Sequence, residues 1–349
     1  MTPTSDNARD SDSRLIGNFG RLGWLSYFPG CAIYGAGAMP AKHTPSPAHA
    51  TRPKVGLVLG SGGSSCPEFD PGEVNMNGNI PTLYVHGRTL PEAWEKAVLA
   101  CWNQGIAVKT EYDKPGDPPS RDCTILWVAE DPFAEPRIHR AFPGGLEDLE
   151  IYRQEVVDGV HDHWIAPEEG KWTYTYHKRL FAYEIEGKVI DQINYIIDKL
   201  SGAGHSRRAQ AITWNAKLDP PTYDPPCLQR VWCRVLQNED GGSVLNMNCH
   251  WRSRDAYKAA FMNVFALTDL QRLMAARISE KTGKPVRVGR YADLVDSFHI
   301  YGSYFNEFQG FLKMVEKRSF EERTWPSSYA EPMFAEARER LKKEKEKGI

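Results

Sequence analysis

The chain has 349 residues and a formal net charge of −2, with 41% hydrophobic and 25% charged residues, which is typical of a folded globular protein. This balance gives no overall basic field for nucleic acid, and no apolar run approaches the roughly 20 residues of a membrane-spanning helix. The seven cysteines are scattered without a CxxC pair, so they indicate neither a disulfide framework nor a zinc site. We therefore expect a cytoplasmic protein that binds no metal and has neither a membrane nor a nucleic acid as its partner.

Composition divides the chain into three parts. Residues 1–52 are polar and rich in Pro, Ser, Ala and Gly, and they predict a flexible or peripheral N-terminal extension. Residues 53–330 predict a single domain, and residues 331–349, rich in lysine and glutamate, predict a charged C-terminal helix or tail.

Hydrophobic periodicity and turn residues predict both strands and helices along the domain. In chain order we expect strands at 54–59 and 82–85, helices at 90–98, 146–157 and 189–200, strands at 209–214, 229–236 and 244–251, a helix at roughly 256–281 and a strand leading to 299–301. Most of 111–145 reads as loops. This mixed order favours an α+β fold around one large sheet.

Two short motifs carry the chemistry. Cys227 ends the proline-rich turn Asp224-Pro225-Pro226, and a thiolate held in this way is a soft nucleophile that can add to an electron-poor double bond and leave again. The second motif, Arg252-Ser253, combines a forked cation with a hydroxyl, which suits a phosphate group.

From about residue 160 to 312 the sequence resembles thymidylate synthase and the related pyrimidine-nucleotide hydroxymethylases, in the divergent archaeal-type branch. The matching blocks come in the order of that family: Asp191-Gln192-Ile193, Ser206-Arg207-Arg208, Trp214-Asn215, Pro226-Cys227, Arg252-Ser253-Arg254-Asp255, Asn263 and His299-Ile300-Tyr301. The resemblance implies a large mixed sheet packed against helices, with the back of the sheet forming a homodimer interface. It also implies transfer of a one-carbon unit from 5,10-methylenetetrahydrofolate to position 5 of a pyrimidine nucleoside 5′-monophosphate.

The resemblance assigns a nucleophile and a phosphate site. Cys227 would attack position 6 of the ring, which makes position 5 nucleophilic. Arg252 and Ser253 would bind the phosphate together with Arg207 and Arg208, which in this family reach in from the partner subunit. Arg121 is a further candidate for a phosphate arginine.

The resemblance also assigns residues to the base, the sugar and the folate. Asn263 would read the uracil edge, since a side-chain amide can both donate and accept. His299 and Tyr301 would bind the sugar hydroxyl from one face of a strand. Asp255 would orient or protonate the folate ring, and Trp164 would shield the one-carbon unit.

The general acid or base and the active-site tyrosine are assigned less directly, because the match slips upstream of residue 160. For the carboxylate that moves protons at the ring, Glu135 is the first candidate and Glu147 the second. For the tyrosine, the candidates are Tyr176 and Tyr174, in the block 174–177.

Some positions depart from the common bacterial pattern and leave the reaction open. Leu228 follows Cys227 where the common enzymes have histidine, Trp251 stands where they have glutamine, and the short apolar tail that closes over folate is not evident. Because closure excludes water, a less closed site favours hydroxymethylation over hydride transfer. Asn263 favours methylation of dUMP to dTMP, with hydroxymethylation of dUMP, dCMP or CMP as the alternative. A non-catalytic member that binds nucleotide or RNA is a third reading, against which the presence of Cys227 argues.

Overall fold

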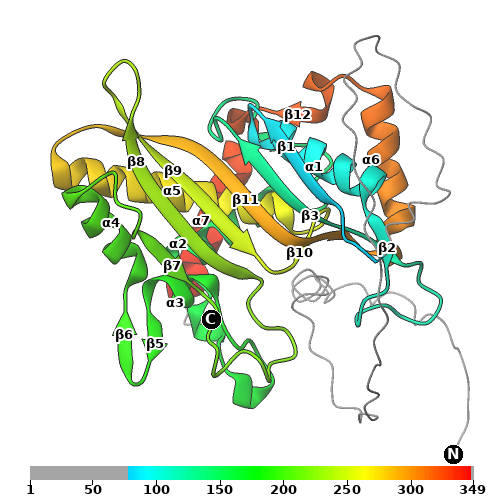
Figure 1. Cartoon of the computed structure of the whole chain (residues 1–349), viewed down its shortest axis with the longest axis horizontal. Coiled ribbons are helices and arrows are strands. Elements are labelled where there is room, and N and C mark those ends of the chain that lie inside the picture. Colours follow the sequence, from blue (N-terminus) through cyan, green and yellow to red (C-terminus); the bar gives the residue numbers. More distant parts are fainter. Residues whose placement is uncertain (1–77, 347–349) are drawn as a thin grey trace, which may run out of the picture.

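A computed structural model describes residues 78–346, and Figure 1 shows them coloured along the chain. The predicted N-terminal extension at 1–52 and the predicted strand at 54–59 lie outside the described residues. Within the described part, no helix combines the length and the apolar character needed to cross a membrane.

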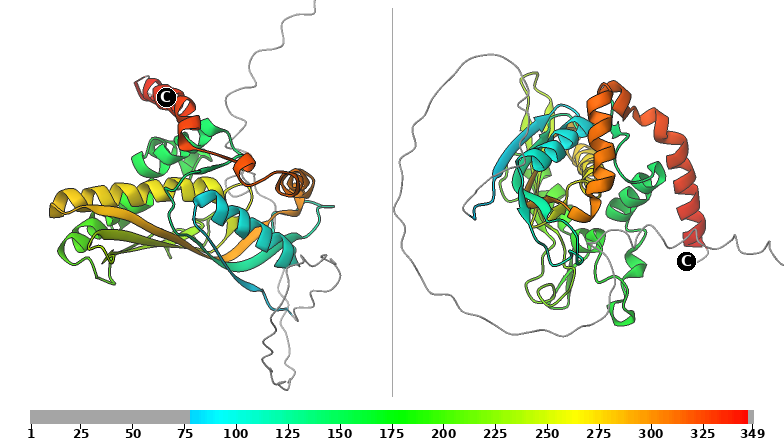
Figure 2. Two further views of the ribbon diagram at one scale, coloured as in Figure 1. Left: turned by 90° about the horizontal axis from the view of Figure 1, so that it is seen from above. Right: turned by 90° about the vertical axis from the view of Figure 1, so that its right-hand side faces the viewer.

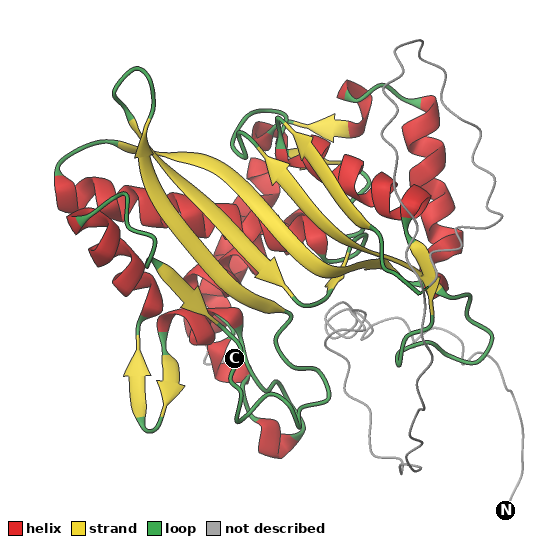
Figure 3. Ribbon diagram, viewed as in Figure 1, coloured by secondary structure: helices red, strands yellow, loops and turns green. Residues whose placement is uncertain are grey.

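One mixed sheet forms the centre of the molecule (Figure 3). Its strands are β1 (Thr82–Gly87), β2 (Ile106–Val108), β3 (Ser120–Ala129), β7 (Gln210–Ile212), β8 (Leu228–Gln237), β9 (Ser243–Trp251), β10 (Arg254–Asp255) and β11 (Val286–Ile300). They run in the order β1-β3-β11-β9-β8-β7, with β2 paired to β3 and β10 paired to β11. The β1–β3, β9–β11 and β10–β11 pairs are parallel, and the other pairs are antiparallel.

Helices cover one face of this sheet, as the side views in Figure 2 show. They are α1 (Leu90–Gln104), α2 (Leu146–Asp158), α3 (Tyr176–Phe181), α4 (Gln192–Gly202), α5 (Ala260–Thr282), α6 (Phe305–Lys317) and α7 (Ser327–Glu346). The α5 helix lies between the sheet and α2, α7 packs on the outer side of α2, and α4 packs at the β7 edge. Two small sheets, β4 (Ile138–His139) with β12 (Thr324–Trp325) and β5 (Tyr183–Ile185) with β6 (Lys188–Ile190), complete the domain. The fold is therefore α+β with a large mixed sheet packed against helices, as the sequence predicts.

Side chains alternate across the sheet between the helical face and the open face. On β11, Asp293 and Val295 are buried, whereas Leu294 between them is 40% exposed. Leu294 pairs with Leu126 on β3, which in turn pairs with Tyr84 on β1, and all three lie exposed. The face of the sheet that carries no helix therefore presents a row of apolar side chains.

The structure corrects three of the predicted elements. Residues 120–129, predicted as loop, form the long strand β3, because the alternating apolar residues Cys123, Ile125 and Trp127 are buried against the helices. The helix predicted at 189–200 begins at Gln192, because the side chain of Asp191 caps it by accepting from Asn194 N. The C-terminal helix is not fully solvated: Phe334 and Leu341 are buried on its inner side.

A buried ion pair joins the centre of the sheet to the start of α5. The guanidinium of Arg254 on β10 donates to the carboxylate of Asp293 on β11 and to the Ala260 carbonyl (3.1 Å). The indole of Trp251 donates to the same carboxylate (3.0 Å), and the Arg254 guanidinium lies 3.9 Å from the Trp251 ring centroid. The turn between β9 and β10 is therefore held by contacts with β11 and with the start of α5.

We predict that Asp293→Ala lowers the free energy of unfolding by about 3–5 kcal/mol, because Arg254 is then buried without a counter-charge. Asp296→Ala, on the same strand, breaks an exposed pair with His250 and should cost at most about 1 kcal/mol. Urea unfolding followed by circular dichroism measures both. Equal losses of unfolding free energy in the two variants would contradict the claim that the buried pair stabilises the fold more than the exposed pair does.

Candidate active site

Arg252 shapes the turn that carries Cys227. Cys227 is half-buried immediately before β8, and its carbonyl accepts from the Arg252 backbone N–H (3.0 Å). The Arg252 guanidinium donates to the carbonyls of Pro226 (Nε, 3.1 Å) and Pro225 (Nη2, 2.6 Å). The two motifs singled out in the sequence are thus in direct contact, and the remaining N–H groups of Arg252 can serve an anion.

Tyr176 is the tyrosine that meets this turn. Its hydroxyl accepts from the backbone N–H of Leu228 (3.3 Å), and its ring contacts Trp251 edge-on with centroids 5.8 Å apart. The other candidate, Tyr174, lies beside Arg179 (5.8 Å from ring centroid to guanidinium carbon). The structure therefore brings Tyr176, rather than Tyr174, to the backbone that positions the thiol.

The thiol of Cys227 is a weak acid in this environment. Burial raises its pKa to about 11, with Asp224 adding to the rise and Arg252 opposing it. Since a buried thiolate lacks water to stabilise its charge, the sulfur is protonated near neutral pH. The arginine that holds the turn is thus also the strongest influence in favour of the reactive form.

A second group of polar residues lies where β10 meets β11. Asp255 and His299 are paired in register, and their neighbours in this group are Tyr301 and Tyr304. Burial raises the pKa of Asp255 to about 6 and lowers that of His299 to about 4. His299 Nε2 is buried with no hydrogen-bond partner among the described residues, whereas the Asp255 carboxyl and the Tyr304 hydroxyl interact with each other. A buried atom without a partner, such as His299 Nε2, is suited to bind a polar ligand.

Tyr112 links the two groups and was not anticipated from the sequence. Its ring lies 5.9 Å from that of Tyr223 and 6.3 Å from that of Tyr301, between centroids. Burial raises its pKa to about 12, with the Asp224 carboxylate as the next cause. Because Tyr112 stands in a loop outside the matching blocks, no motif pointed to it.

Asn263, the predicted base-reading residue, lies on α5 and faces α2. Its Nδ2 donates to the hydroxyl of Tyr152 at 2.7 Å, and both side chains are half-buried. Tyr152 is the other residue that sequence reasoning missed, because it stands just upstream of the part of the chain that resembles the family.

Arg207 and Arg208 are exposed just before β7, and only their backbones are anchored. The Arg207 carbonyl accepts from Trp232 Nε1 (3.0 Å), and that of Arg208 accepts from the Tyr195 hydroxyl (3.2 Å). Within residues 78–346, no carboxylate forms an ion pair with either guanidinium. Ser253 is half-buried in the turn between β9 and β10, beside Arg252.

The remaining predicted residues contact other parts of the fold. The Glu135 carboxylate accepts from the backbone N–H groups of Arg137 and Ser327 (3.0 Å each) at the start of α7. Glu147 pairs with Arg340 on α7 (2.5 Å). Arg121 on β3 donates to the Gly105 carbonyl (3.1 Å). The structure gives neither glutamate a contact with Cys227, so the identity of the general acid or base stays a prediction.

Trp164 belongs to an aromatic group at the 3₁₀ turn Asp162–Trp164. Its ring stacks on His161 with centroids 3.7 Å apart and meets Trp172 edge-on at 5.1 Å. His161 in turn contacts the buried carboxylate of Glu155 (3.0 Å). Trp164 is therefore held among aromatic neighbours, and its shielding role stays a prediction.

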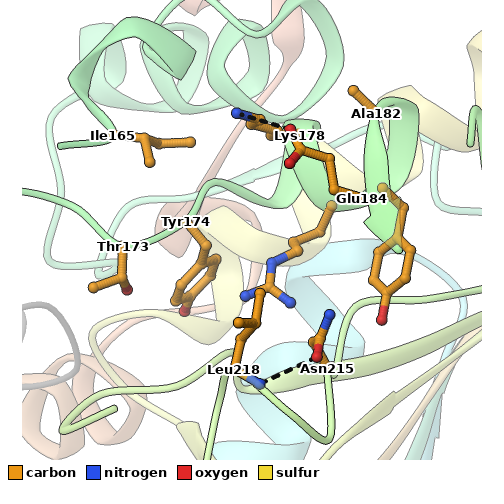
Figure 4. A pocket seen from close by; sticks show the side chains of 10 residues that line it. Ile165, Thr173, Tyr174, Lys178, Ala182, Glu184, Asn215 and Leu218 are labelled. Atoms are coloured by element: carbon orange, nitrogen blue, oxygen red, sulfur yellow. Dashed lines mark hydrogen bonds and ion pairs between the residues drawn. The ribbon is translucent and has the colours of Figure 1, made fainter. Parts of the chain in front are cut away.

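A pocket of about 130 Å³ adjoins this segment (Figure 4). Lys178 and Glu184 form an ion pair at its rim (3.5 Å), and Arg179 is held by Asp219 (2.6 Å). Tyr174 and Asn215 also line it. The charges within the pocket are thus already paired, and Tyr174 belongs to this pocket.

Comparison with known proteins identifies the class. A family model described as thymidylate synthase matches residues 145–326, just over half of the chain. A provisionally named thymidylate synthase of Methanopyrus kandleri is 31% identical over 207 residues, which is 58% of this chain and 88% of that protein. A protein of the same name from Methanocaldococcus jannaschii is 31% identical over 224 residues, 63% of this chain and 90% of that protein. Among solved structures, thermostable thymidylate synthase A of Bacillus subtilis matches with a TM-score of 0.46 and 19% identity, covering 66% of this chain and 86% of that one.

These matches define an enzyme of the one-carbon transferase class. The chain belongs to the thymidylate synthase family, whose substrates are a nucleotide and methylenetetrahydrofolate.

We predict that Asp224→Asn lowers the pKa of the Cys227 thiol and Arg252→Gln raises it, because a nearby negative charge disfavours the thiolate and a positive charge favours it. The rate of iodoacetamide labelling of the Cys227 peptide, followed from pH 7 to 11 by mass spectrometry, measures the effect. In Asp224→Asn the rate should rise several-fold at pH 8 (about threefold for half a pKa unit). Asp240→Asn, exposed in the β8–β9 turn, is the matched control and should leave the profile unchanged. An unchanged profile in Asp224→Asn would contradict the assigned electrostatics.

Proposed function

We propose that this enzyme converts dUMP to dTMP in the cytoplasm, through a covalent bond between Cys227 and the pyrimidine ring. The observation that supports the proposal is the contact of Arg252 with the Cys227 turn, which brings a guanidinium to the loop that carries the thiol. The five cysteines of the described residues are all free thiols, which fits a reducing compartment.

The chain's own residues supply the steps at the ring. The Cys227 sulfur forms a bond to position 6, and position 5 becomes nucleophilic as the ring electrons shift toward the carbonyl at position 4. Methylenetetrahydrofolate supplies the one-carbon unit and, in the methylation, the hydride. Position 5 then loses its proton as the bond from the one-carbon unit to the folate nitrogen breaks, which leaves an exocyclic methylene and releases tetrahydrofolate. In the methylation, tetrahydrofolate gives a hydride to this methylene and becomes dihydrofolate, the sulfur leaves position 6, and the ring double bond is restored.

Asp255, His299 and Tyr301 fit the recognition of sugar and folate. His299 is neutral at physiological pH, so its buried Nε2 exchanges a hydrogen bond with a hydroxyl at no cost in charge. Asp255, with its pKa near 6, accepts a hydrogen bond from the folate ring or gives a proton to it. These roles match the residue types and the burial of each group.

Hydroxymethylation is the second candidate reaction, because Leu228 and Trp251 depart from the common bacterial pattern. The side chain of Leu228, next to Cys227, is fully buried and apolar, so it offers no polar group to the ring. Which reaction takes place depends on whether water or hydride reaches the one-carbon unit.

The product decides between these reactions. We predict that the purified protein, incubated with methylenetetrahydrofolate and dUMP, forms dTMP and dihydrofolate, and that Cys227→Ser lowers the rate by at least about 10³-fold. Formation of a 5-hydroxymethyl nucleotide with tetrahydrofolate would replace the first candidate by the second. Absence of product from dUMP, dCMP and CMP alike would contradict both and favour a non-catalytic binding protein.

We also propose that the enzyme is a homodimer joined by the open face of the sheet. The exposed row of Tyr84, Leu126 and Leu294 is an apolar surface of the kind that protein interfaces bury. Arg207 and Arg208, whose guanidinium groups form no ion pair within the described residues, lie at the end of the sheet beside β7, where they can complete the phosphate site of a partner subunit.

Subunit complementation tests the shared site. Cys227→Ala and Arg207→Ala/Arg208→Ala chains are each expected to be inactive as homodimers. After mixed refolding, half of the dimers are hybrids, and each hybrid contains one intact site, so activity should return to about one quarter of the wild-type value. A mixture no more active than its parents would contradict arginine sharing, and refolded wild-type protein is the control for recovery.

A further inference from the structure

His299 stands between two carboxylates in the sheet. On β11 it pairs in register with Asp122 of β3 on one side and with Asp255 of β10 on the other. Residues directly opposite each other on neighbouring strands project their side chains from the same face of the sheet. Both His299 and Asp122 are buried. The imidazole therefore lies among groups that can decide which of its two nitrogens carries the proton.

The backbone carbonyl of Ser297 marks the nitrogen that carries it. This carbonyl lies 3.2 Å from Nδ1 of His299. Since a carbonyl oxygen can only accept a hydrogen bond, Nδ1 must be the donor. Burial lowers the pKa of His299 to about 4, so the ring is neutral near pH 7 and has a single N–H. With that proton on Nδ1, the other nitrogen, Nε2, is an acceptor.

The side chain of Ser297 connects the same nitrogen to Asp122. Ser297 stands where the pairing of β11 with β3 shifts register, between Val295 and Phe298. Its hydroxyl lies 3.3 Å from His299 Nδ1 and donates to Asp122 Oδ2 (2.8 Å). Burial raises the pKa of Asp122 to about 6, so above that pH the carboxylate is ionised and can only accept. The Ser297 oxygen therefore turns its lone pairs toward Nδ1 and becomes a second acceptor for its proton.

Nε2 is the ring nitrogen left for a ligand. It is buried, and no group within residues 78–346 forms a hydrogen bond with it. A ligand hydroxyl can donate to this nitrogen. A ligand group that only accepts would leave two acceptors facing each other away from water, which is unfavourable.

We propose that Asp122 and Ser297 are positioning residues, which keep the proton of His299 on Nδ1 so that Nε2 accepts a hydrogen bond from a sugar hydroxyl of the nucleotide. The inference rests on the proposed function, in which His299 contacts the sugar. Asp122 and Ser297 act through the imidazole and not on the reacting atoms. Because the only free sugar hydroxyl of dUMP is at position 3′, the site selects nucleotides whose 3′-hydroxyl is free to donate.

The position of the proton can be measured in the free protein. ¹⁵N NMR of the full chain with labelled histidine distinguishes a protonated from an unprotonated ring nitrogen by chemical shift. Among the ten histidines, the signal of His299 is the one that is absent from His299→Gln. We expect the proton on Nδ1. A proton on Nε2 would overturn the inference, whatever the protein binds.

A ligand pair tests the direction of the hydrogen bond. In 2′,3′-dideoxy-3′-fluorouridine 5′-monophosphate, a fluorine replaces the 3′-hydroxyl of dUMP and cannot donate. Wild-type protein should bind this analogue about tenfold more weakly than dUMP, the effect of about one hydrogen bond. Titration calorimetry on the full chain gives the ratio of the two dissociation constants.

Variants test the two positioning residues through the same ratio. In Ser297→Ala the imidazole loses its connection to Asp122, so the preference for dUMP should fall by about threefold, whereas Ser297→Thr keeps a hydroxyl and should retain it. Adding Asp122→Asn to Ser297→Ala should change the ratio by less than about twofold, because Asp122 acts only through the serine. Ser328→Ala removes an exposed hydroxyl from α7 and is the matched control, with an unchanged ratio.

Each other outcome has a definite meaning. If wild-type protein binds dUMP and the fluorinated analogue equally well, the inference is overturned while the proposed function stands. If Ser297→Ala weakens both ligands to the same extent, Ser297 has only a structural role, and its positioning role is overturned. If wild-type protein binds neither ligand, the proposed function fails and this inference fails with it.

Discussion

The buried pair of Arg254 and Asp293 is the interaction on which the candidate active site depends. Arg254 stands between Ser253 and Asp255, so fixing its guanidinium to β11, to the Trp251 ring and to the Ala260 carbonyl fixes the residues on either side. Burial of two charges is costly and is compensated here by hydrogen bonds from Trp251 and Tyr291 to the same carboxylate. The arrangement ties Arg252, the proposed phosphate ligand, and the polar group around Asp255 to the buried Arg254–Asp293 pair.

Burial gives the site its chemical character. The Cys227 thiol and the His299 imidazole are both held neutral, because a poorly solvated site disfavours charge. Arg252 favours the thiolate through its position at the turn. In the proposed reaction, such a site would keep Cys227 protonated in the free protein and leave the remaining N–H groups of Arg252 for the anionic part of a substrate.

Much of the fold could be predicted from periodicity, and the rest could not for identifiable reasons. The apolar face of α4 (Ile193, Ile196, Ile197 and Leu200) is buried as its spacing predicts. Strand β3 was missed because turn residues at both ends and the polar pair Arg121-Asp122 obscure its alternation.

Within the site, Cys227, Arg252 and Tyr176 meet as expected, since short motifs specify them. Tyr112 and Tyr152 reach the site through tertiary packing, which no local pattern records. Glu135 was chosen by its place in the sequence, and it caps the start of α7.

The central claim is that Cys227 is a nucleophile toward a pyrimidine nucleotide. Intact-mass and peptide mass spectrometry after incubation with 5-fluoro-dUMP and methylenetetrahydrofolate tests it most directly, because fluorine at position 5 cannot leave as a proton does and the bond to sulfur persists. We expect a covalent adduct on the peptide containing Cys227 that is absent from Cys227→Ala, while that variant still binds dUMP. An adduct that persists in Cys227→Ala, or that maps to another residue, would show that Cys227 is not the nucleophile.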